Sequence, residues 1–297
     1  MPSRIQQTCT IAFNILAVTS RLDSEEMKFW KTFVGALLVA SFLLISSAGP
    51  AQEQTAPAPE TLKTELTVAA AADLSSALKE IAGNYEKKTG VTIKLSLGAS
   101  GALTQQIQNG APFDVFFSAD MDYPRQLIAA GVADGASLYE YAIGELVMWV
   151  PANSLLDPEH KGMIVLLDPS VKKIAIANPQ HAPYGRAAVA ALKHAGLYDQ
   201  VSDRLVLGEN ISQAAQFAES GNAQVGFVAL AHVVAPEMQG KGKYWKIPAD
   251  FYPALAQGVV TITLSPHQKE AAAFVEYIKT KETGKLLQKY GFTLPPI

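Results

Sequence analysis

The chain has 297 residues, of which 49% are hydrophobic and 17% are charged, and its formal net charge is −3. This is an ordinary globular composition with enough length for two hydrophobic cores, and it excludes a disordered, collagenous or coiled-coil chain. The near-neutral charge, without a Lys/Arg cluster, argues against nucleic acid as a partner. Because net charge would not attract an anionic ligand, such a ligand would have to be held by local dipoles.

The segment 27–51 has the pattern of a secretory signal peptide. Lys28 and Lys31 precede a short apolar run over 33–45, and small residues that suit a cleavage site follow the run. The run is short for a transmembrane helix, so a membrane anchor is the weaker alternative. We therefore expect a soluble protein that is exported to the periplasm.

The segments 1–26 and 52–61, which flank this signal, are expected to lie outside the fold. We interpret residues 1–26 as a mis-assigned upstream extension, with Met27 as the true initiator. Residues 52–61, rich in Pro, Ala and Gln, are expected to form a flexible leader. Cys9 is the only cysteine and precedes the signal, so we expect no disulfide and no thiolate metal site in the mature protein.

After residue 62, short apolar strands alternate with amphipathic helices. Asp73 is a suitable N-cap for the first helix, which has apolar residues at helical spacing and ends at Gly90. In the first half the pattern predicts strands over 65–70, 91–97 and 113–118, and helices over 73–90, about 101–110 and 122–130. In the second half it predicts strands over 174–177, 205–207 and 225–229, and helices over 186–195, 211–220, 265–280 and 282–290.

This alternation predicts an α/β architecture with mostly parallel sheets. Two longer apolar strands, over 142–150 and 254–264, separate the blocks of strand–helix units. We interpret these strands as two crossings between lobes. Lobe one is then expected to comprise 62–142 plus 255–297, and lobe two 143–254.

Four strand-to-helix turns are short and rich in small residues. In open α/β sheets, ligands bind at the carboxyl ends of strands, where helices begin and leave unpaired N–H groups that favour an anion. Taken alone, each turn is also explained without a ligand, because Gly, Ser and Asp commonly connect strands and helices in α/β folds. The four turns are Ala71-Ala72-Asp73, Gly98-Ala99-Ser100-Gly101, Pro183-Tyr184-Gly185 and Glu209-Asn210-Ile211.

No pattern indicates catalysis or a resident metal. The five histidines lack metal-ligand spacing, and no nucleophile–base motif, Walker loop or HExxH motif occurs. Asp114 and Asp120 flank a predicted buried strand and are interpreted as turn residues. We therefore expect neither an enzyme nor a cofactor.

From about residue 66 to residue 292 the chain resembles the periplasmic molybdate-binding proteins of ABC transporters, the ModA family. The most specific match is GASGALTQQIQNGAPFDVFFSAD over 98–120, and the order and spacing of all matching blocks agree. The other blocks are LTVAAAADLSSALKEIAGNYEKKTG, IAIANPQHAPYGRAAVAALKHAGLYD, LGENISQAAQFAESGNAQVGFVAL and KLLQKYGFTLP.

The resemblance implies a type II periplasmic-binding-protein fold, in which two α/β lobes joined by two crossing strands close over an oxyanion. It implies oxyanion binding by Ser100 through its hydroxyl and N–H, and by the backbone N–H groups of Tyr184 and Ile211. These three residues would contact the metal only through molybdate oxygens. The flanking residues expected around them are Ala72, Ala99, Gly101, Gly185, Arg186, Asn210 and Ala229.

Two positions depart from the family pattern. Asp73, which we count as the fourth oxyanion-binding residue, stands where the family has a serine ligand. Ala229 stands where members can supply a tyrosine hydroxyl, a donor that Tyr184 could replace. We weigh three interpretations of Asp73. Its side chain caps its own helix, or it pairs with Arg186 across the cleft, or it accepts a proton from a protonated oxyanion such as hydrogen phosphate.

The sequence thus predicts a monomeric periplasmic protein that captures molybdate or tungstate for an ABC importer and docks on a membrane permease. A binding protein for phosphate or sulfate is the nearest alternative. An exported enzyme or a sensory module on the same fold is a more distant one.

Overall fold

The computed structural model describes residues 64–296. The expected upstream extension (1–26), signal peptide (27–51) and flexible leader (52–61) lie outside the described residues. Within 64–296, no helix combines the length and the apolar character that a membrane span requires.

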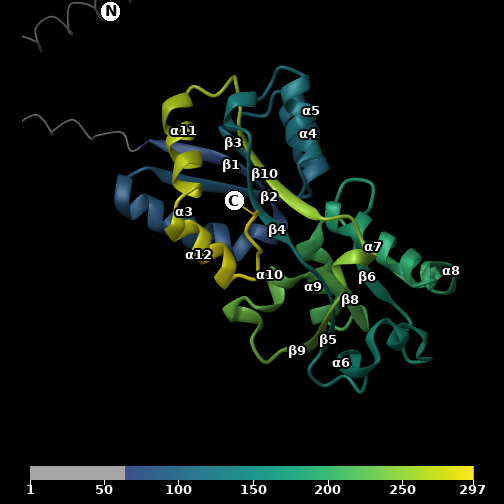
Figure 1. The fold of residues 1–297 in the computed structure, drawn as a ribbon. Coiled ribbons are helices and arrows are strands. Elements are labelled where there is room, and N and C mark those ends of the chain that lie inside the picture. The colour runs from purple at the N-terminus through teal and green to yellow at the C-terminus, as the bar shows by residue number, and fades with distance from the viewer. Residues whose placement is uncertain (1–63, 297) are drawn as a thin grey trace, which may run out of the picture. The chain divides into compact units, whose positions relative to one another are not determined.

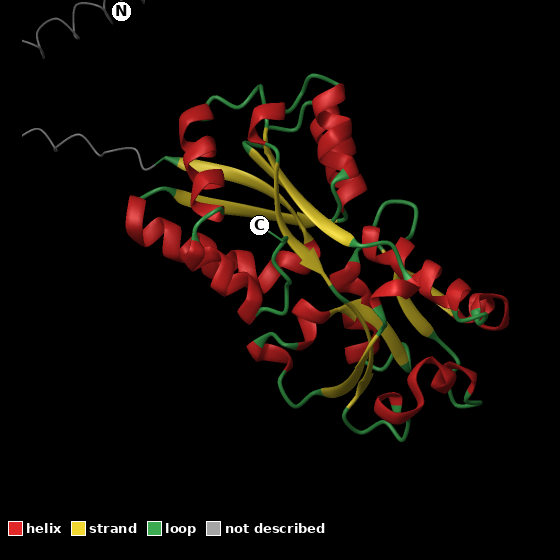
Figure 2. Ribbon diagram, in the orientation of Figure 1, coloured by secondary structure: helices red, strands yellow, loops and turns green. Residues whose placement is uncertain are grey.

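The described chain forms two five-stranded mixed sheets (Figures 1 and 2), with the strand orders β2-β1-β3-β10-β4 and β7-β6-β8-β5-β9. In each sheet the first three strands in this order are parallel. The next strand, β10 in the first sheet and β5 in the second, pairs antiparallel with the third. The first sheet contains β1 (Glu65–Ala71), β2 (Thr92–Gly98), β3 (Val115–Ser118), β4 (Tyr139–Gly144) and β10 (Leu255–Thr261). The second contains β5 (Leu146–Pro151), β6 (Ile174–Ala177), β7 (Leu205–Gly208), β8 (Val225–Ala229) and β9 (Gly242–Lys246).

Helices follow most of these strands, and we call each sheet with its helices a lobe. The first lobe has the 3-10 turn η2 (Ala72–Leu74) and the helices α3 (Ser75–Thr89), α4 (Ser100–Gln108), α5 (Asp122–Ala129), α11 (Gln268–Ile278) and α12 (Lys281–Lys289). The second lobe has α6 (Pro158–Lys161), α7 (Pro183–His194), α8 (Tyr198–Val201), α9 (Ile211–Glu219) and α10 (Leu230–Val233). The α/β architecture with two lobes is as the sequence predicted.

The predicted strand over 142–150 is in fact two strands in different sheets. β4 pairs with β10 in the first sheet, β5 pairs with β8 and β9 in the second, and Glu145 lies between them. The chain returns to the first sheet between β9 and β10. The residues on both sides of Glu145 are apolar and buried, so the apolar pattern did not distinguish two strands from one.

The first sheet is covered on both faces, as parallel strands require. Val68 and Ala70 pack in one core with residues of α3 and α11, whereas Ala69 and Phe116 pack in another with residues of α4 and α5. Figure 1 shows α3, α11 and α12 on one side of this sheet and α4 and α5 on the other. Side chains that alternate along a strand point to opposite faces, which explains why the sequence shows apolar runs.

Phe274 attaches the C-terminal helices to the first lobe. Its side chain is fully buried, and its ring lies 4.9 Å from the Tyr85 ring of α3 and 6.0 Å from the Phe117 ring of β3, centroid to centroid. Aromatic rings at such separations contribute both buried area and favourable edge contacts.

We expect Phe274→Ala to lower the free energy of unfolding by about 3–5 kcal/mol, because it removes a ring from a filled core. Urea denaturation measures this change. The control is Leu155→Ala, since Leu155 is fully exposed and its loss should change stability by less than about 0.5 kcal/mol. Equal effects of the two variants would contradict the described packing.

Candidate functional site

The structure brings residues of all four predicted turns around one small pocket between the lobes. The pocket is small, with about 200 Å³ of free space when the part open to solvent is included. Two of its turns follow the parallel strands β1 and β2, and the others follow β6 and β7. Its lining residues are Ala71, Ala72, Asp73, Gly98, Ala99, Ser100, Ala119, Ala182, Pro183, Tyr184, Asn210 and Ile211.

Three helix N-termini face this pocket. Ser100 is the first residue of α4, Ile211 is the first of α9, and Tyr184 is the second of α7. The first N–H groups of a helix have no intrahelical acceptor, and no acceptor within residues 64–296 receives the N–H of these three residues. Together with the helix dipoles, they favour a negative charge in the pocket.

The helix α7 begins three residues before the predicted start at Arg186. Pro183 occupies its first turn, where a missing N–H costs nothing and the fixed φ angle suits a helix. This earlier start matters because it brings the Tyr184 N–H into the unpaired first turn.

Ser100 is placed to donate a hydrogen bond from its hydroxyl. The side chain is buried, and Oγ accepts a hydrogen bond from the Ala119 N–H at 3.0 Å. A hydroxyl has one proton and two acceptor positions, so the bond from Ala119 leaves the proton free for a ligand. The sequence did not single out Ala119, whose contribution lies only in its backbone.

The flanking residues named from the sequence fall into two groups. Ala72, Ala99 and Asn210 line the pocket, and Asn210 also caps α9 by accepting from the Gln213 N–H at 3.1 Å. Gly101, Gly185, Arg186 and Ala229 are not among the lining residues. Ala229 lies buried at the end of β8.

Asp73 does not cap its helix, which corrects the first interpretation. It lies within η2, the helix α3 begins two residues later, and neither element has a side-chain cap bond. The carboxyl is buried instead, and its Oδ2 accepts a hydrogen bond from Gln257 Nε2 at 2.5 Å. Its Oδ1 is buried without a hydrogen-bond partner among the described residues.

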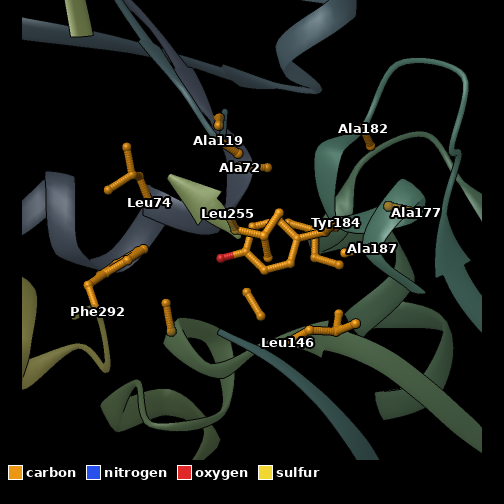
Figure 3. Packing of buried hydrophobic residues seen from close by; sticks show 14 of the residues in the cluster. Ala72, Leu74, Ala119, Leu146, Ala177, Ala182, Tyr184, Ala187, Leu255 and Phe292 are labelled. Atoms are coloured by element: carbon orange, nitrogen blue, oxygen red, sulfur yellow. The ribbon is translucent and has the colours of Figure 1, made fainter. Parts of the chain in front are cut away.

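Gln257 contacts Asp73, and Tyr141 contacts Gln257. The sequence pattern singled out neither residue. Gln257 Oε1 accepts from the Tyr141 hydroxyl at 2.6 Å, and its Nε2 also lies 3.3 Å from the Tyr184 hydroxyl. Tyr184 belongs to the same buried cluster as Leu146, Leu255 and Ala187 (Figure 3). A lone glutamine inside an otherwise apolar strand was the available signal.

Gly144 makes room for this network where β4 ends. A Cβ atom at this position would lie 2.2 Å from the Tyr184 hydroxyl and 2.7 Å from Gln257 Nε2. Such distances are impossible, so the absence of a side chain lets Tyr184 of the second lobe reach the strands of the first.

Burial raises the pKa of Asp73 from 3.8 to about 6, although hydrogen bonds from Gln257 and Tyr184 act in the opposite direction. Desolvation disfavours the charged carboxylate, and no basic side chain lines the pocket to compensate. Burial and the neighbouring Asp73 also hold the pKa of Tyr184 well above its ordinary value, so this hydroxyl keeps its proton.

Arg186 pairs with Asp120 rather than with Asp73, which corrects the second interpretation. Its guanidinium forms an ion pair with the Asp120 carboxylate and donates to the Tyr123 hydroxyl at 3.1 Å. The Arg186 side chain is 43% exposed. It therefore lies at the rim, whereas Asp73 is buried against β10.

Two further hydrogen bonds join the lobes close to the pocket. The Gly101 N–H donates to the His181 carbonyl at 2.9 Å, and the Ser212 hydroxyl donates to the Ala72 carbonyl at 3.1 Å. His232 Nε2 lies 2.8 Å from the same Ser212 oxygen. Burial lowers the pKa of His232 to about 4, so this histidine is neutral and adds no charge to the site.

We expect Asp73→Asn to stabilise the unliganded protein at neutral pH and to have no such effect near pH 4. A folded-state pKa of about 6 means that the folded protein holds a proton that the unfolded chain releases, so stability falls as pH rises from about 4 to about 6. The difference between variant and wild type should reach about 3 kcal/mol at neutral pH.

Urea denaturation of both proteins between about pH 4 and pH 7 measures this difference. Taking the difference is essential, because the lowered pKa of His232 makes the wild-type stability change in the opposite direction over the same window. A difference that is constant with pH would show that Asp73 titrates normally.

We expect Arg186 and Asp120 to be energetically coupled by about 0.5–1 kcal/mol in a double-mutant cycle with Arg186→Gln and Asp120→Asn. The pair joins two lobes, so the coupling requires the lobes to be in contact. The matched control is the exposed pair Arg125–Asp122 within α5, for which we expect less than about 0.5 kcal/mol. No coupling for the first pair would indicate that the lobes separate in solution.

Comparisons with known proteins agree with this geometry. The family described as bacterial extracellular solute-binding protein matches residues 66–293. The molybdate-binding protein ModA of Rhodobacter capsulatus is 37% identical over 228 residues, which are 77% of this chain and 88% of the relative. The ModA of Azotobacter vinelandii is 38% identical over 230 residues, 77% of this chain and 90% of the relative.

Two solved structures support the fold. The periplasmic molybdate-binding protein of Azotobacter vinelandii superimposes with a TM-score of 0.74 at 36% identity, covering 78% of this chain and all of that one. The sulfate-binding protein SubI of Mycobacterium tuberculosis superimposes with a TM-score of 0.62 at 18% identity, over 77% of this chain and 86% of that one. The second likeness concerns the fold alone, and the periplasmic-binding-protein fold expected from the sequence is confirmed. With two five-stranded lobes, four turns around one pocket and more than a third of the aligned residues identical to those of two ModA proteins, the chain belongs to the ModA family of molybdate-binding proteins, among the bacterial extracellular solute-binding proteins.

Proposed function

We propose that this protein captures molybdate or tungstate in the periplasm and delivers it, as a monomer, to the permease of an ABC importer. The chain is a solute-binding protein and not an enzyme, since its family consists of binding proteins. The identity of the solute, the export of the mature protein through its signal peptide and the docking on a permease are inferred for this chain from its relatives and its sequence.

The convergence of three helix N-termini on one pocket without a basic side chain carries this proposal. Unpaired N–H groups of Ser100, Tyr184 and Ile211 supply hydrogen-bond donors, and the Ser100 hydroxyl supplies another. Each hydrogen bond to a charged oxygen contributes about 1.5–3 kcal/mol. Four such donors are enough to hold a dianion tightly without lysine or arginine.

Selectivity would follow from the size of the pocket. The donors belong to helices whose positions are set by two packed sheets, so the ring they form cannot contract freely. A ring that fits the longer bonds of molybdate and tungstate holds the smaller sulfate loosely.

Capture would involve a change in the angle between the lobes. Ser100 belongs to the first lobe, while Tyr184 and Ile211 belong to the second, so the full donor set exists only when the lobes are in contact. The segments between β4 and β5 and between β9 and β10 are the two connections about which such a motion would occur.

Hydrogen phosphate is the alternative that a specific observation favours. Asp73 lines the pocket, and an ionised carboxylate accepts a hydrogen bond from a protonated oxyanion. This alternative predicts tight phosphate binding that disappears in Asp73→Asn. A sulfate-binding protein is the further alternative, but fully ionised sulfate has no proton to offer that carboxylate.

Isothermal titration calorimetry with molybdate, tungstate, sulfate and phosphate tests the proposal. We expect dissociation constants in the micromolar range or below for molybdate and tungstate, and at least about 100-fold weaker binding of sulfate and phosphate. Tight binding of phosphate without binding of molybdate would replace the proposed ligand and leave the fold unaffected.

Ser100→Ala should weaken molybdate binding about 10- to 100-fold, because it removes one hydroxyl donor to a charged ligand. Thr104→Val is the matched control, since Thr104 is a buried hydroxyl residue of the same helix that bonds to the Ser100 carbonyl rather than lining the pocket. If both variants bind molybdate like the wild type, the Ser100 hydroxyl has no role in binding.

A further inference from the structure

Asp73 presents an unsatisfied carboxyl oxygen at a site proposed to receive a dianion. The residue lines the pocket and is only 2% exposed. Its Oδ1 has no hydrogen-bond partner among the described residues. A buried polar atom without a partner is costly, and this cost points to a ligand that would supply the missing bond.

The hydrogen bonds around Asp73 determine which of its oxygens can carry a proton. The Tyr141 hydroxyl donates to Gln257 Oε1, so the other end of that amide, Nε2, is the end that donates to Asp73 Oδ2. Oδ2 is therefore occupied as an acceptor. When this carboxyl is protonated, the proton is on Oδ1, and the O–H group can donate a hydrogen bond to a ligand.

Among residues 64–296, no basic side chain contacts Asp73 or lines the pocket to neutralise a charged Asp73 beside a dianion. The side chains that contact it, Gln257 from β10 and Tyr184 from α7, are uncharged, as is Tyr141 from β4 behind them. Arg186 of α7 is held by Asp120 at the rim. On the side of α9 and α10 lies the neutral His232, which reaches the Ala72 carbonyl through Ser212.

We propose that Asp73 binds the oxyanion as a neutral carboxylic acid that donates a hydrogen bond from Oδ1, so that capture of each oxyanion takes up one proton from solution. This inference rests on the proposed function and gives Asp73 the donor role of a hydroxyl. The charges balance, because a carboxylate, a proton and a dianion combine into a complex in which only the ligand is charged. No covalent bond to the ligand forms or breaks.

The geometry explains why a carboxyl can occupy this position. An ionised Asp73 would repel the ligand in a site of low dielectric constant, whereas the protonated form removes the repulsion and adds a donor. The raised pKa of Asp73, about 6 in the unliganded protein, reduces the free energy needed to protonate it. A bound dianion raises that pKa further, so proton uptake extends above neutral pH.

Calorimetry of the wild-type protein with molybdate tests the inference directly. Titrations in buffers with different ionisation enthalpies, at several values between about pH 6 and pH 8, measure the number of protons taken up. Molybdate itself remains a dianion over this range, so any uptake belongs to the protein. We expect uptake approaching one proton, and a dissociation constant that rises up to tenfold per pH unit.

Asp73→Asn is a permanent mimic of the neutral acid. Its side-chain oxygen can accept from Gln257, and its NH₂ group then takes the place of the Oδ1 proton. We expect this variant to bind molybdate without proton uptake, with an affinity that is independent of pH and equals or exceeds that of the wild type near pH 8. Asp114→Asn is the matched control.

Asp114 is also a buried aspartate of the first lobe, bonded to Ser265, His267 and the Thr67 N–H rather than lining the pocket. Its variant should keep the proton uptake of the wild type. Wild-type molybdate binding without proton uptake and with a flat pH profile would overturn the inference and leave the proposed function intact. Absence of molybdate binding at every pH would overturn both. The wild-type measurement decides the matter even if a variant fails to fold.

Discussion

The parallel pairing of β1 with β2 and of β6 with β7 is the constraint on which the site depends. Parallel neighbours end at the same edge of a sheet, so the turns that follow them meet there. Each lobe contributes two such turns, and the first turns of α4, α7 and α9 direct the unpaired N–H groups of Ser100, Tyr184 and Ile211 to one pocket. These dipoles are fixed by backbone geometry and need no reorganisation when an anion arrives, in contrast to long basic side chains, which lose rotamer freedom.

The second organising feature is a polar network in the connection between the lobes. Tyr141 precedes the first crossing, Gln257 follows the second, and Asp73 and Tyr184 belong to opposite sides of the pocket. Asp73 is therefore linked by hydrogen bonds to a residue near each of the two connections between the lobes. Buried polar networks are favourable only when every member is satisfied, and the free Oδ1 of Asp73 leaves this one incomplete without a ligand.

Polar contacts and buried apolar side chains both join the lobes, since one apolar cluster contains Leu255 of the first lobe and Leu146 and Tyr184 of the second. The polar contacts close to the pocket are the rim pair Arg186–Asp120, the Gly101–His181 backbone bond and the Ser212–Ala72 bond. Partly exposed polar contacts of this kind contribute little net free energy each. In the proposed capture, a bound oxyanion would add hydrogen bonds from both lobes to these contacts.

The sequence by itself determined the α/β alternation, the four short turns between strands and helices and the absence of basic residues in them, because these features depend on residues close together in the chain. It did not determine the partner of Asp73, which is Gln257, 184 residues away, or the partner of Arg186. Local rules predicted a cap for Asp73, but tertiary structure placed a crossing strand behind it. The start of α7 at Pro183 and the break at Glu145 were likewise decided by how the two sheets pack. A polar side chain takes the partner that the packed fold brings to it, and the sequence pattern around it does not record that partner.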